Sequence, residues 1–367
     1  MASIKKRTDG RWRARYRDPD GKERAHHAAT KAAAQAWLDS QTASMVRGDY
    51  VDPKAGRTAL RDYAETWLVR MRPGWRAATD AAVTNSLDKH VLPVLGGRAL
   101  AGITRADVEA LCASLPLAAS TVATVHQHLG QLLGAAVEDG LIARNLAVRA
   151  RLPRASGVKA QPVALEVVER VHAALPDWLA VAVPLGVGVG LRQGEASGLS
   201  VDRVDFLRRT LRVDRQLVDR NVEEPVLTPP KTASSNRTVP LADFVVEALS
   251  VHLAHFKREP GQLVLLDPDG LPVASGRFGH QWRRAVKAAG APGLRYHDLR
   301  HTYASTLLSR GVSIKAVADW LGHASPTTTL STYAHVMPAD DDVARGVLDA
   351  AFTQTADSSR TEDAEDA

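Results

Sequence analysis

Polar and apolar positions alternate strictly near the start of the chain, within residues 1–50. In the segment GRWRARYRD, one face of an extended strand would carry arginines and the other face Trp12, Ala14 and Tyr16. The DPDG that follows is typical of a tight turn, and KERAHH predicts a second strand. The next segment predicts a helix that begins at the N-cap residue Thr30. Residues 1–50 are therefore predicted to form a small domain of β-sheet and one helix.

The arginine face of this strand is a candidate DNA-binding surface. Residues on one face of a strand follow each other at roughly 6.6–6.8 Å, close to the step between phosphates along one DNA strand. The alternative is that these side chains are only solvated on a half-exposed sheet. We favour DNA contact, and the candidate residues are Arg11, Arg13, Arg15 and Arg17.

Residues 57–148 show helical periodicity throughout. One apolar stripe recurs at the spacing of a single helix face and comprises Leu60, Tyr63, Ala64, Trp67, Leu68 and Met71. A second helix is predicted from Thr104, which forms a capping-box pattern with Asp107. A third helix ends before Gly140. The pattern predicts an all-helical domain, followed by a basic linker at 149–162 that is rich in Pro, Gly and small residues.

Residues 163–352 mix helical patterns with short strands. LRVDRQLVDR alternates like a strand, and EEPVLTPPKTASSNRTVPL reads as strand, loop and strand. The glycines of GVGVG match no phosphate-binding loop, and we interpret them as packing positions. An α+β domain is predicted here, and the acidic tail at 353–367 is expected to be disordered. The predicted fold class is thus multidomain and mainly α, with two small sheet-containing domains around a helical one.

Charge and composition narrow the function. The net charge is +6, with eleven Lys or Arg against six Asp or Glu in residues 1–50, and one against five in residues 351–367. A basic body indicates a polyanionic partner such as nucleic acid. The single cysteine, Cys112, permits no intramolecular disulfide. Because no apolar run suits a membrane span or a secretory signal, we expect a cytoplasmic protein without a membrane partner.

The segment YHDLRHTYAS, residues 296–305, admits three chemistries: a zinc pair, a phosphate grip with a tyrosine nucleophile, or an ordinary amphipathic helix. On a helical wheel His297, Arg300 and His301 share one polar arc. Tyr303 falls between leucines, which predicts a core residue. Zinc is disfavoured because Asp298 stands where a metallopeptidase helix has its glutamate, and because an arginine lies between the histidines.

The phosphate interpretation has candidate partners elsewhere in the chain. Metal-free cleavage of a phosphodiester needs donors for the non-bridging oxygens, a nucleophile, and an acid for the leaving oxygen. GLRQGEASGL supplies Arg192 and, one turn later, Glu195, while PPKTASSNRTVPL supplies Lys231. WLGHASPTTTLSTYAHV supplies His323 and Tyr333, with a new helix predicted to begin at Ser325 and Pro326.

The order of these residues and their flanking strings resembles the tyrosine recombinase, or phage integrase, family. The positions are Arg192, Lys231, His297, Arg300, His323 and Tyr333, and the LGH and TYAHV contexts add to their specificity. The resemblance covers the whole chain. It implies an arm-type DNA-binding domain at 1–50, a helical core-binding domain at 57–148 and a catalytic domain at 163–352.

The resemblance also implies a role for each position. Tyr333 would attack the scissile phosphate to form a 3′-phosphotyrosyl bond, and Arg192 and Arg300 would clamp its non-bridging oxygens. Lys231 would protonate the 5′-oxygen, His297 would help move the tyrosine proton, and His323 would donate to the phosphate. Glu195 would orient its neighbours as a supporting carboxylate. No role is implied for His301.

Two consequences follow from this family chemistry. The cluster of arginines and a lysine is expected to favour the phenolate of Tyr333, whose ordinary pKa is about 10. The resemblance further implies recombination without metal, ATP or another cofactor, on double-stranded attachment-site DNA, by a homotetramer in a bacterial host cytoplasm. Accessory DNA-bending or excision factors are further candidate partners.

Three functions remain open at this point. The arm-like block favours integration and excision of a prophage or integrative element. The alternatives are a recombinase with a resolution role and an integrase-like protein that binds DNA without cleaving it.

Overall fold

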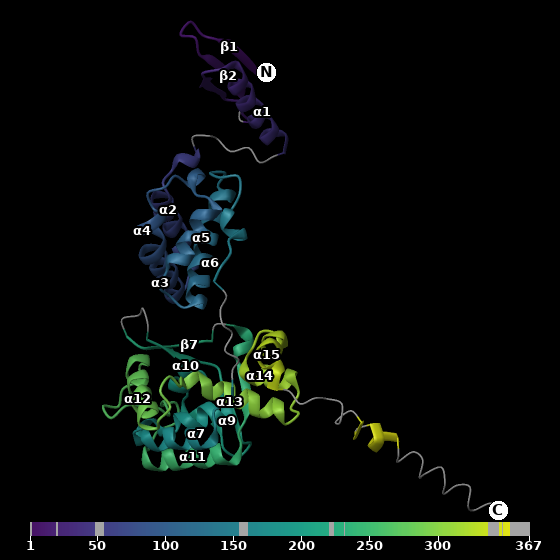
Figure 1. The fold of residues 1–367 in the computed structure, drawn as a ribbon. Coiled ribbons are helices and arrows are strands. Elements are labelled where there is room, and N and C mark those ends of the chain that lie inside the picture. The colour runs from purple at the N-terminus through teal and green to yellow at the C-terminus, as the bar shows by residue number, and fades with distance from the viewer. Residues whose placement is uncertain are drawn as a thin grey trace, which may run out of the picture. The chain divides into compact units, whose positions relative to one another are not determined.

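The computed structural model describes residues 2–19, 21–47, 55–153, 161–219, 224–230, 232–336, 345–346 and 348–352. The acidic tail at 353–367 lies outside these residues. The contacts between residues divide the chain into two compact units, Met1–Gly157 and Val158–Ala367 (Figure 1). Each unit is described by itself. Within the described residues, no helix is both long enough and apolar enough to cross a lipid bilayer.

The N-terminal part is a three-stranded antiparallel sheet with one helix, and it contains the two strands and the helix that the sequence predicts. Its strands β1 (Ser3–Lys6), β2 (Trp12–Arg17) and β3 (Glu23–Ala28) lie in that order, and α1 (Lys31–Arg47) follows. The central strand β2 buries Ala14 and Tyr16 against the helix and exposes its arginines. The first strand was not predicted, because four residues with only one large apolar side chain carry too little pattern.

The second part of the first unit is helical throughout. Its helices are α2 (Leu60–Met71), α3 (Ala77–Ser86), the π-helical turn η3 (Leu87–Val91), α4 (Leu92–Leu95), α5 (Arg105–Ser114) and α6 (Ala119–Glu138). The predicted stripe of α2 is buried, apart from the half-buried Met71. The predicted capping box of Thr104 and Asp107 is present at the start of α5. Gly140 follows α6 with φ +69, so its missing side chain allows the left-handed turn that ends the helix.

The second unit combines helices with two small sheets. Its helices are α7 (Leu165–Ala174), α8 (Asp177–Ala180), α9 (Ala182–Val189), α10 (Gln193–Ser197), α11 (Asp243–His255), α12 (Ser275–Ala288), α13 (Tyr296–Ser309), α14 (Ile314–Leu321) and α15 (Pro326–Tyr333). One sheet has the order β4 (Val204–Asp205), β5 (Thr210–Val213), β8 (Arg237–Pro240). The other is the hairpin of β6 (Gln216–Val218) and β7 (Val226–Thr228). The α+β prediction for this part of the chain is confirmed.

Helix α9 lies at the centre of this unit and packs closely against α13. Its residues are apolar on every side, as expected for a helix surrounded by protein. A side chain at Gly186 would come within 2.8 Å of Leu299 on α13. At the C-terminal end of α9, Gly190 has φ +69, and a Cβ there would lie 2.7 Å from the ring of Tyr303. A Cβ at Gly188 would collide with Val245, so all three glycines of this segment are packing positions, as predicted. The close approach positions α13 beside the chain that leads to α10.

We expect Gly190→Ala to destabilise the second unit more than Gly290→Ala does. Both glycines have a positive φ, +69 and +71, so both substitutions carry the cost of a left-handed conformation, about 1–2 kcal/mol. Only Gly190 also meets a neighbour, since nothing lies within 4 Å of the position that a Cβ would take at Gly290. The added clash with Tyr303 is expected to cost about 1–3 kcal/mol more. Calorimetric unfolding of the full chain measures both variants, and equal losses would contradict this packing argument.

Candidate active site

The predicted residues come from four elements of the second unit. Arg192 stands at the start of α10, and His297, Arg300 and His301 lie on α13. His323 lies between α14 and α15, and Tyr333 is the last residue of α15. Lys231 lies outside the described residues. A cavity of about 410 Å³ is lined by ten residues, namely Arg192, Glu195, Gln216, Pro230, Thr232, Ser235, Gly322, His323, Ala324 and Thr328.

Arg192 and Glu195 are tied to each other at the first turn of α10. The backbone N–H of Arg192 donates to Oε2 of Glu195 at 2.9 Å, and its Nη1 donates to Oε1 at 2.8 Å. The Arg192 side chain is 37% exposed while that of Glu195 is 4% exposed. The carboxylate therefore holds the arginine from behind and leaves its outer edge facing the cavity.

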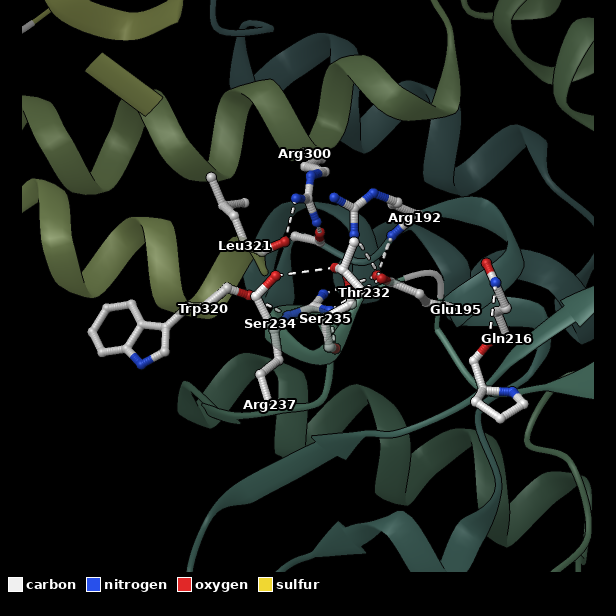
Figure 2. A network of polar contacts seen from close by, with 12 residues as sticks. Arg192, Glu195, Gln216, Thr232, Ser234, Ser235, Arg237, Arg300, Trp320 and Leu321 are labelled. Carbon is white, nitrogen blue, oxygen red and sulfur yellow. Dashed lines mark hydrogen bonds and ion pairs between the residues drawn. The ribbon is translucent and has the colours of Figure 1, made fainter. Parts of the chain in front are cut away.

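A second arginine, which the sequence analysis did not identify, completes this arrangement. Arg237 begins β8 and is buried, and its Nη1 and Nη2 donate to the two oxygens of Glu195 at 3.0 and 2.8 Å (Figure 2). Its Nε donates to the carbonyl of Trp320 on α14 at 2.5 Å. Arg237 thus connects β8, α10 and α14. The NRTVPL string gave no sign of this, because its partner lies 42 residues away in the sequence.

Glu195 remains ionised in this environment. Burial by itself would raise the pKa of the carboxyl, but hydrogen bonds and charge from Arg237, with the charges of Arg192 and Arg300, lower it to about 2. A buried carboxylate with two bound guanidinium groups is the arrangement that offsets the desolvation of all three charges.

Arg300 is held by backbone carbonyls. It is 2% exposed, its Nη1 donates to the carbonyl of Gly190 at 2.6 Å, and its Nη2 donates to the carbonyl of Leu321 (Figure 2). Burial and repulsion from Arg192 lower its pKa to about 9, so it stays cationic at neutral pH. A guanidinium has five N–H groups, and the two carbonyls take only two of them. The others can bind an anion.

His323 is oriented by the turn before it and by the helix after it. Gly322 ends α14 with φ +66, and a Cβ there would lie 3.1 Å from Nη1 of Arg237. The predicted start of α15 is confirmed, with Ser325 as N-cap and Pro326 in the first turn. The ring nitrogen Nδ1 of His323 lies 2.8 Å from the hydroxyl of the buried Thr329. This contact leaves the other ring nitrogen, Nε2, available for another partner, and His323 lines the cavity.

Tyr333 is buried and bonded to a histidine to which the sequence analysis gave no role. The hydroxyl of Tyr333 lies 2.6 Å from Nδ1 of His301, and the tyrosine is 2% exposed. Burial raises the pKa of Tyr333 to about 12, although the charge of Arg300 acts in the opposite direction. Desolvation outweighs the charge of Arg300, so Tyr333 is a neutral phenol in this structure and not the phenolate that the sequence led us to expect.

The remaining aromatic residues of α13 take different positions. His297 is exposed, and its ring meets that of His301 edge to face with centroids 4.8 Å apart. Tyr303 is buried in the core, as the helical wheel predicts. Tyr296 is also buried and donates from its hydroxyl to the carbonyl of Ala182 at 3.1 Å.

Metal-binding groups do not gather at this site. Across the part of the chain that the structure describes, no three His, Cys, Asp or Glu side chains lie together as metal ligands would. The positive groups of the site are arranged instead for an oxyanion, since arginine binds phosphate oxygens with fixed, paired donors.

The candidate DNA-binding residues of the N-terminal sheet share its open face, except for one. Arg13, Arg15 and Arg17 are exposed on β2, opposite the face that packs on α1. Glu23 pairs with Arg13 at 3.2 Å and approaches Arg15 at 3.6 Å. Such exposed pairs are weak, so phosphates can displace the carboxylate. Arg11 is exposed but precedes the strand, so it is not part of the alternating arginine face of β2.

Comparison with known proteins accounts for nearly the whole chain. Residues 163–339 match the phage integrase family, residues 60–152 match the phage integrase central domain, and residues 2–47 match the phage integrase N-terminal domain. A prophage phiRv2 integrase of Mycobacterium tuberculosis is 30% identical over 355 residues, which cover 92% of each chain. The integrase of Mycobacterium phage FRAT1 is 26% identical over 332 residues, covering 85% of this chain and 96% of the relative.

Solved structures share the fold at lower identity. The Tn1549 transposon integrase, in complex with a circular intermediate DNA, matches with a TM-score of 0.70 and 20% identity over 80% of this chain and 99% of that one. A lambda integrase tetramer bound to a Holliday junction matches with a TM-score of 0.59 and 20% identity over 92% of this chain and 96% of that one.

We expect Glu195→Gln to lower the free energy of unfolding by about 3–5 kcal/mol, the usual loss when one partner of a buried ion pair is removed. The neutral amide would leave the buried Arg237 without a countercharge. Asp319→Asn is the matched control, because its pair with Lys315 lies on the surface with side chains 56% and 72% exposed. Removing that pair is expected to cost about 0–1 kcal/mol. Calorimetry of the full chain compares the two, and similar losses would contradict the buried-pair assignment.

The same substitution is expected to change the acid stability of the protein. The pKa of Glu195 is lowered on folding, so its contribution is present above about pH 4.5 and is lost as the pH falls towards 2. Wild type should therefore lose stability more steeply than Glu195→Gln across this acid range. Parallel losses in both proteins would show that the carboxylate does not titrate as described.

Proposed function

Because this chain belongs to the phage integrase family of tyrosine recombinases, enzymes that cleave and rejoin DNA, we propose that it integrates and excises a prophage or a related integrative element. The observation that carries the proposal is the combination of an arginine-faced N-terminal sheet with the Arg192, Arg300, His323 and Tyr333 site in one chain. A recombinase that only resolves DNA needs the second of these features but not the first.

We propose that Tyr333 is the nucleophile. Of the three tyrosines of the second unit, it is the one whose hydroxyl contacts a titratable side chain, whereas Tyr296 donates to a backbone carbonyl and Tyr303 lies in the core. Attack on the scissile phosphate forms the 3′-phosphotyrosyl bond and breaks the bond from phosphorus to the 5′-oxygen. The phosphotyrosyl bond retains the energy for rejoining, so the step needs neither metal nor ATP.

The arginines of the site stabilise the charge on the phosphate in this proposal. Arg192 presents the exposed edge that Glu195 does not occupy, and Arg300 retains donors beyond the two that bind carbonyls. Fixed donors in a buried site are worth most where charge develops in the transition state. His323 donates to the same phosphate from the lining of the cavity.

Lys231 is proposed as the acid that protonates the departing 5′-oxygen. Its neighbours in the chain, Pro230 and Thr232, line the same cavity as Arg192 and His323. A lysine is suited to this step because its ammonium is a compact cation whose pKa shifts readily, so it can release a proton.

The assembly that performs recombination is proposed to be a homotetramer on two duplexes, with accessory DNA-bending or excision factors as further partners. A lambda integrase structure holds a tetramer on a Holliday junction, and another holds a dimer on a core site. Strand exchange joins two duplexes, each cut on both strands, so four nucleophiles are required.

The proposed chemistry predicts an SDS-stable adduct in EDTA. The full chain is incubated with nicked duplexes from the element's own ends, beside Tyr333→Phe and the control Tyr303→Phe. We expect wild type and Tyr303→Phe to form the adduct, and Tyr333→Phe to form none while still binding the DNA. An adduct that persists in Tyr333→Phe would contradict the assignment of the nucleophile. Tight binding without any adduct in wild type would instead indicate a DNA-binding protein without catalysis.

The N-terminal sheet is expected to contribute salt-dependent DNA affinity. Replacing Arg13 and Arg15 together with Gln should reduce the slope of log K against log salt by about 2, close to 0.9 for each phosphate contact that is lost. The matched control replaces Arg208 and Arg310, two exposed arginines of the second unit. Titrations of duplexes from the element's ends at several salt concentrations measure both slopes. An unchanged slope in the Arg13 and Arg15 variant would show that the sheet does not contact phosphates.

A further inference from the structure

One contact in the candidate active site has no role in the chemistry described so far. The hydroxyl of Tyr333, at the end of α15, lies 2.6 Å from Nδ1 of His301 on α13. The two residues are 32 positions apart in the sequence, and their rings are tilted by 55° with centroids 5.7 Å apart. The short distance is that of a direct hydrogen bond between a phenol and an imidazole nitrogen.

A buried tyrosine hydroxyl needs a partner in any fold, so the contact must be weighed against simple satisfaction. Tyr296 on the same helix is satisfied by the carbonyl of Ala182, which cannot take a proton. The partner of Tyr333 is instead a side chain that can. Since Tyr333 is the residue that must lose a proton to attack, the nature of its partner has a chemical consequence.

We propose that His301 is the group that accepts the proton of Tyr333 as the tyrosine attacks the phosphate, and that returns it when the DNA strands are rejoined. The inference rests on the proposed function, in which Tyr333 is the nucleophile. His301 touches the reacting oxygen, so it acts as a catalytic residue and not through another side chain.

The step balances without a further reactant. The phenol oxygen forms a bond to phosphorus while its proton moves to Nδ1 of His301, and the bond from phosphorus to the 5′-oxygen breaks. The departing oxygen takes a proton from the acid on the other side of the phosphate. In the reverse step the 5′-hydroxyl attacks phosphorus, and the tyrosine oxygen leaves and recovers its proton from His301.

The surroundings of His301 keep it ready to accept. Burial lowers the pKa of the imidazole, as do the charges of Arg295 and Arg300, while Asp298 raises it. His301 is therefore neutral at physiological pH, with a lone pair on Nδ1 for the phenol proton. Once a proton has arrived, the carboxylate of Asp298 is the nearby group that stabilises the imidazolium.

The elements packed against α13 add few further titratable groups. Helix α9 has none, and on α14 Lys315 and Asp319 pair with each other on the surface. The short segment after α15, η8 (Ala334–Val336), contributes His335. From α13 itself, His297 meets the His301 ring edge to face.

His297 is the competing candidate, because the family resemblance assigns it a part in moving the tyrosine proton. It is exposed, and its described contact is with the ring of His301 and not with the hydroxyl of Tyr333. In our assignment His297 acts on the phosphate side of the site, and His301 acts on the tyrosine side. Removing each in turn separates the two.

The test uses a substrate whose leaving group needs no acid. Nicked duplexes are made with sulfur in place of the bridging 5′-oxygen, because a thiolate leaves without being protonated. The rate of covalent adduct formation in a single turnover then reports only the nucleophile and its base. His301→Asn places an amide oxygen near the position of Nδ1, so it keeps a hydrogen-bond acceptor that cannot take up a proton near neutral pH. His301→Phe removes the acceptor, and His172→Asn, at an exposed position on α7, is the matched control.

We expect His301→Asn and His301→Phe to slow adduct formation by about 10²–10⁴-fold on the sulfur substrate, the usual contribution of a positioned base. His172→Asn should match wild type, and Lys231→Ala should be rescued by the sulfur leaving group. The wild-type rate should be level above neutral pH and fall as His301 becomes protonated in acid. In His301→Asn the rate should rise about tenfold per pH unit towards the pKa of the tyrosine, because solvent must take the proton.

Several outcomes would overturn the assignment. A full rate and an unshifted pH profile in His301→Asn would mean that the histidine only positions the tyrosine. If the rate rises about tenfold per pH unit in His297→Asn instead of in His301→Asn, the role of base belongs to His297. Failure of the proposed function looks different, since wild type would then form no adduct at all. DNA binding by each variant confirms that it is folded. The fall of the wild-type rate at acid pH tests the inference independently of any variant.

Discussion

The catalytic unit depends on one buried carboxylate, Glu195, held between Arg237 and Arg192. The three side chains join α10, β8 and the end of α14, which lie far apart in the sequence. A desolvated charge tolerates few alternative positions, because its partners must meet it with good geometry. The packing of the unit therefore orients the Arg192 side chain towards the cavity before a phosphate binds.

Arg300 makes the second such connection, and Tyr333 lies beside it. By donating to carbonyls at the ends of α9 and α14, Arg300 fixes α13 against both helices. The site thus gathers positive charge on residues that cannot move freely, while burial raises the pKa of Tyr333 to about 12 and keeps it a neutral phenol. In the proposed reaction, the scissile phosphate binds these cations and His301 accepts the proton of Tyr333. The groups that restrain the site are the same ones that the proposed reaction uses.

The sequence predicted what short-range pattern controls. The alternation of β2, the capping box of Thr104 and the start of α15 at Ser325 each depend on a few neighbouring residues, and all three are present. Arg237 was missed because a buried arginine has no periodic signature, and its carboxylate partner is distant in the chain. No role for His301 follows from the sequence, because its partner Tyr333 lies 32 positions away. Burial also outweighs the pKa-lowering effect of Arg300 on Tyr333, since desolvation depends on packing that a helical wheel does not show.

Direct identification of the bond between protein and DNA tests the central claim most directly. The adduct formed in EDTA would be digested with protease and nuclease, and the peptide carrying the nucleotide would be sequenced by tandem mass spectrometry. We expect a nucleotide linked through its 3′-phosphate to the hydroxyl oxygen of Tyr333. A nucleotide on Tyr303, on a serine or on a histidine, or one linked through its 5′-phosphate, would contradict this assignment.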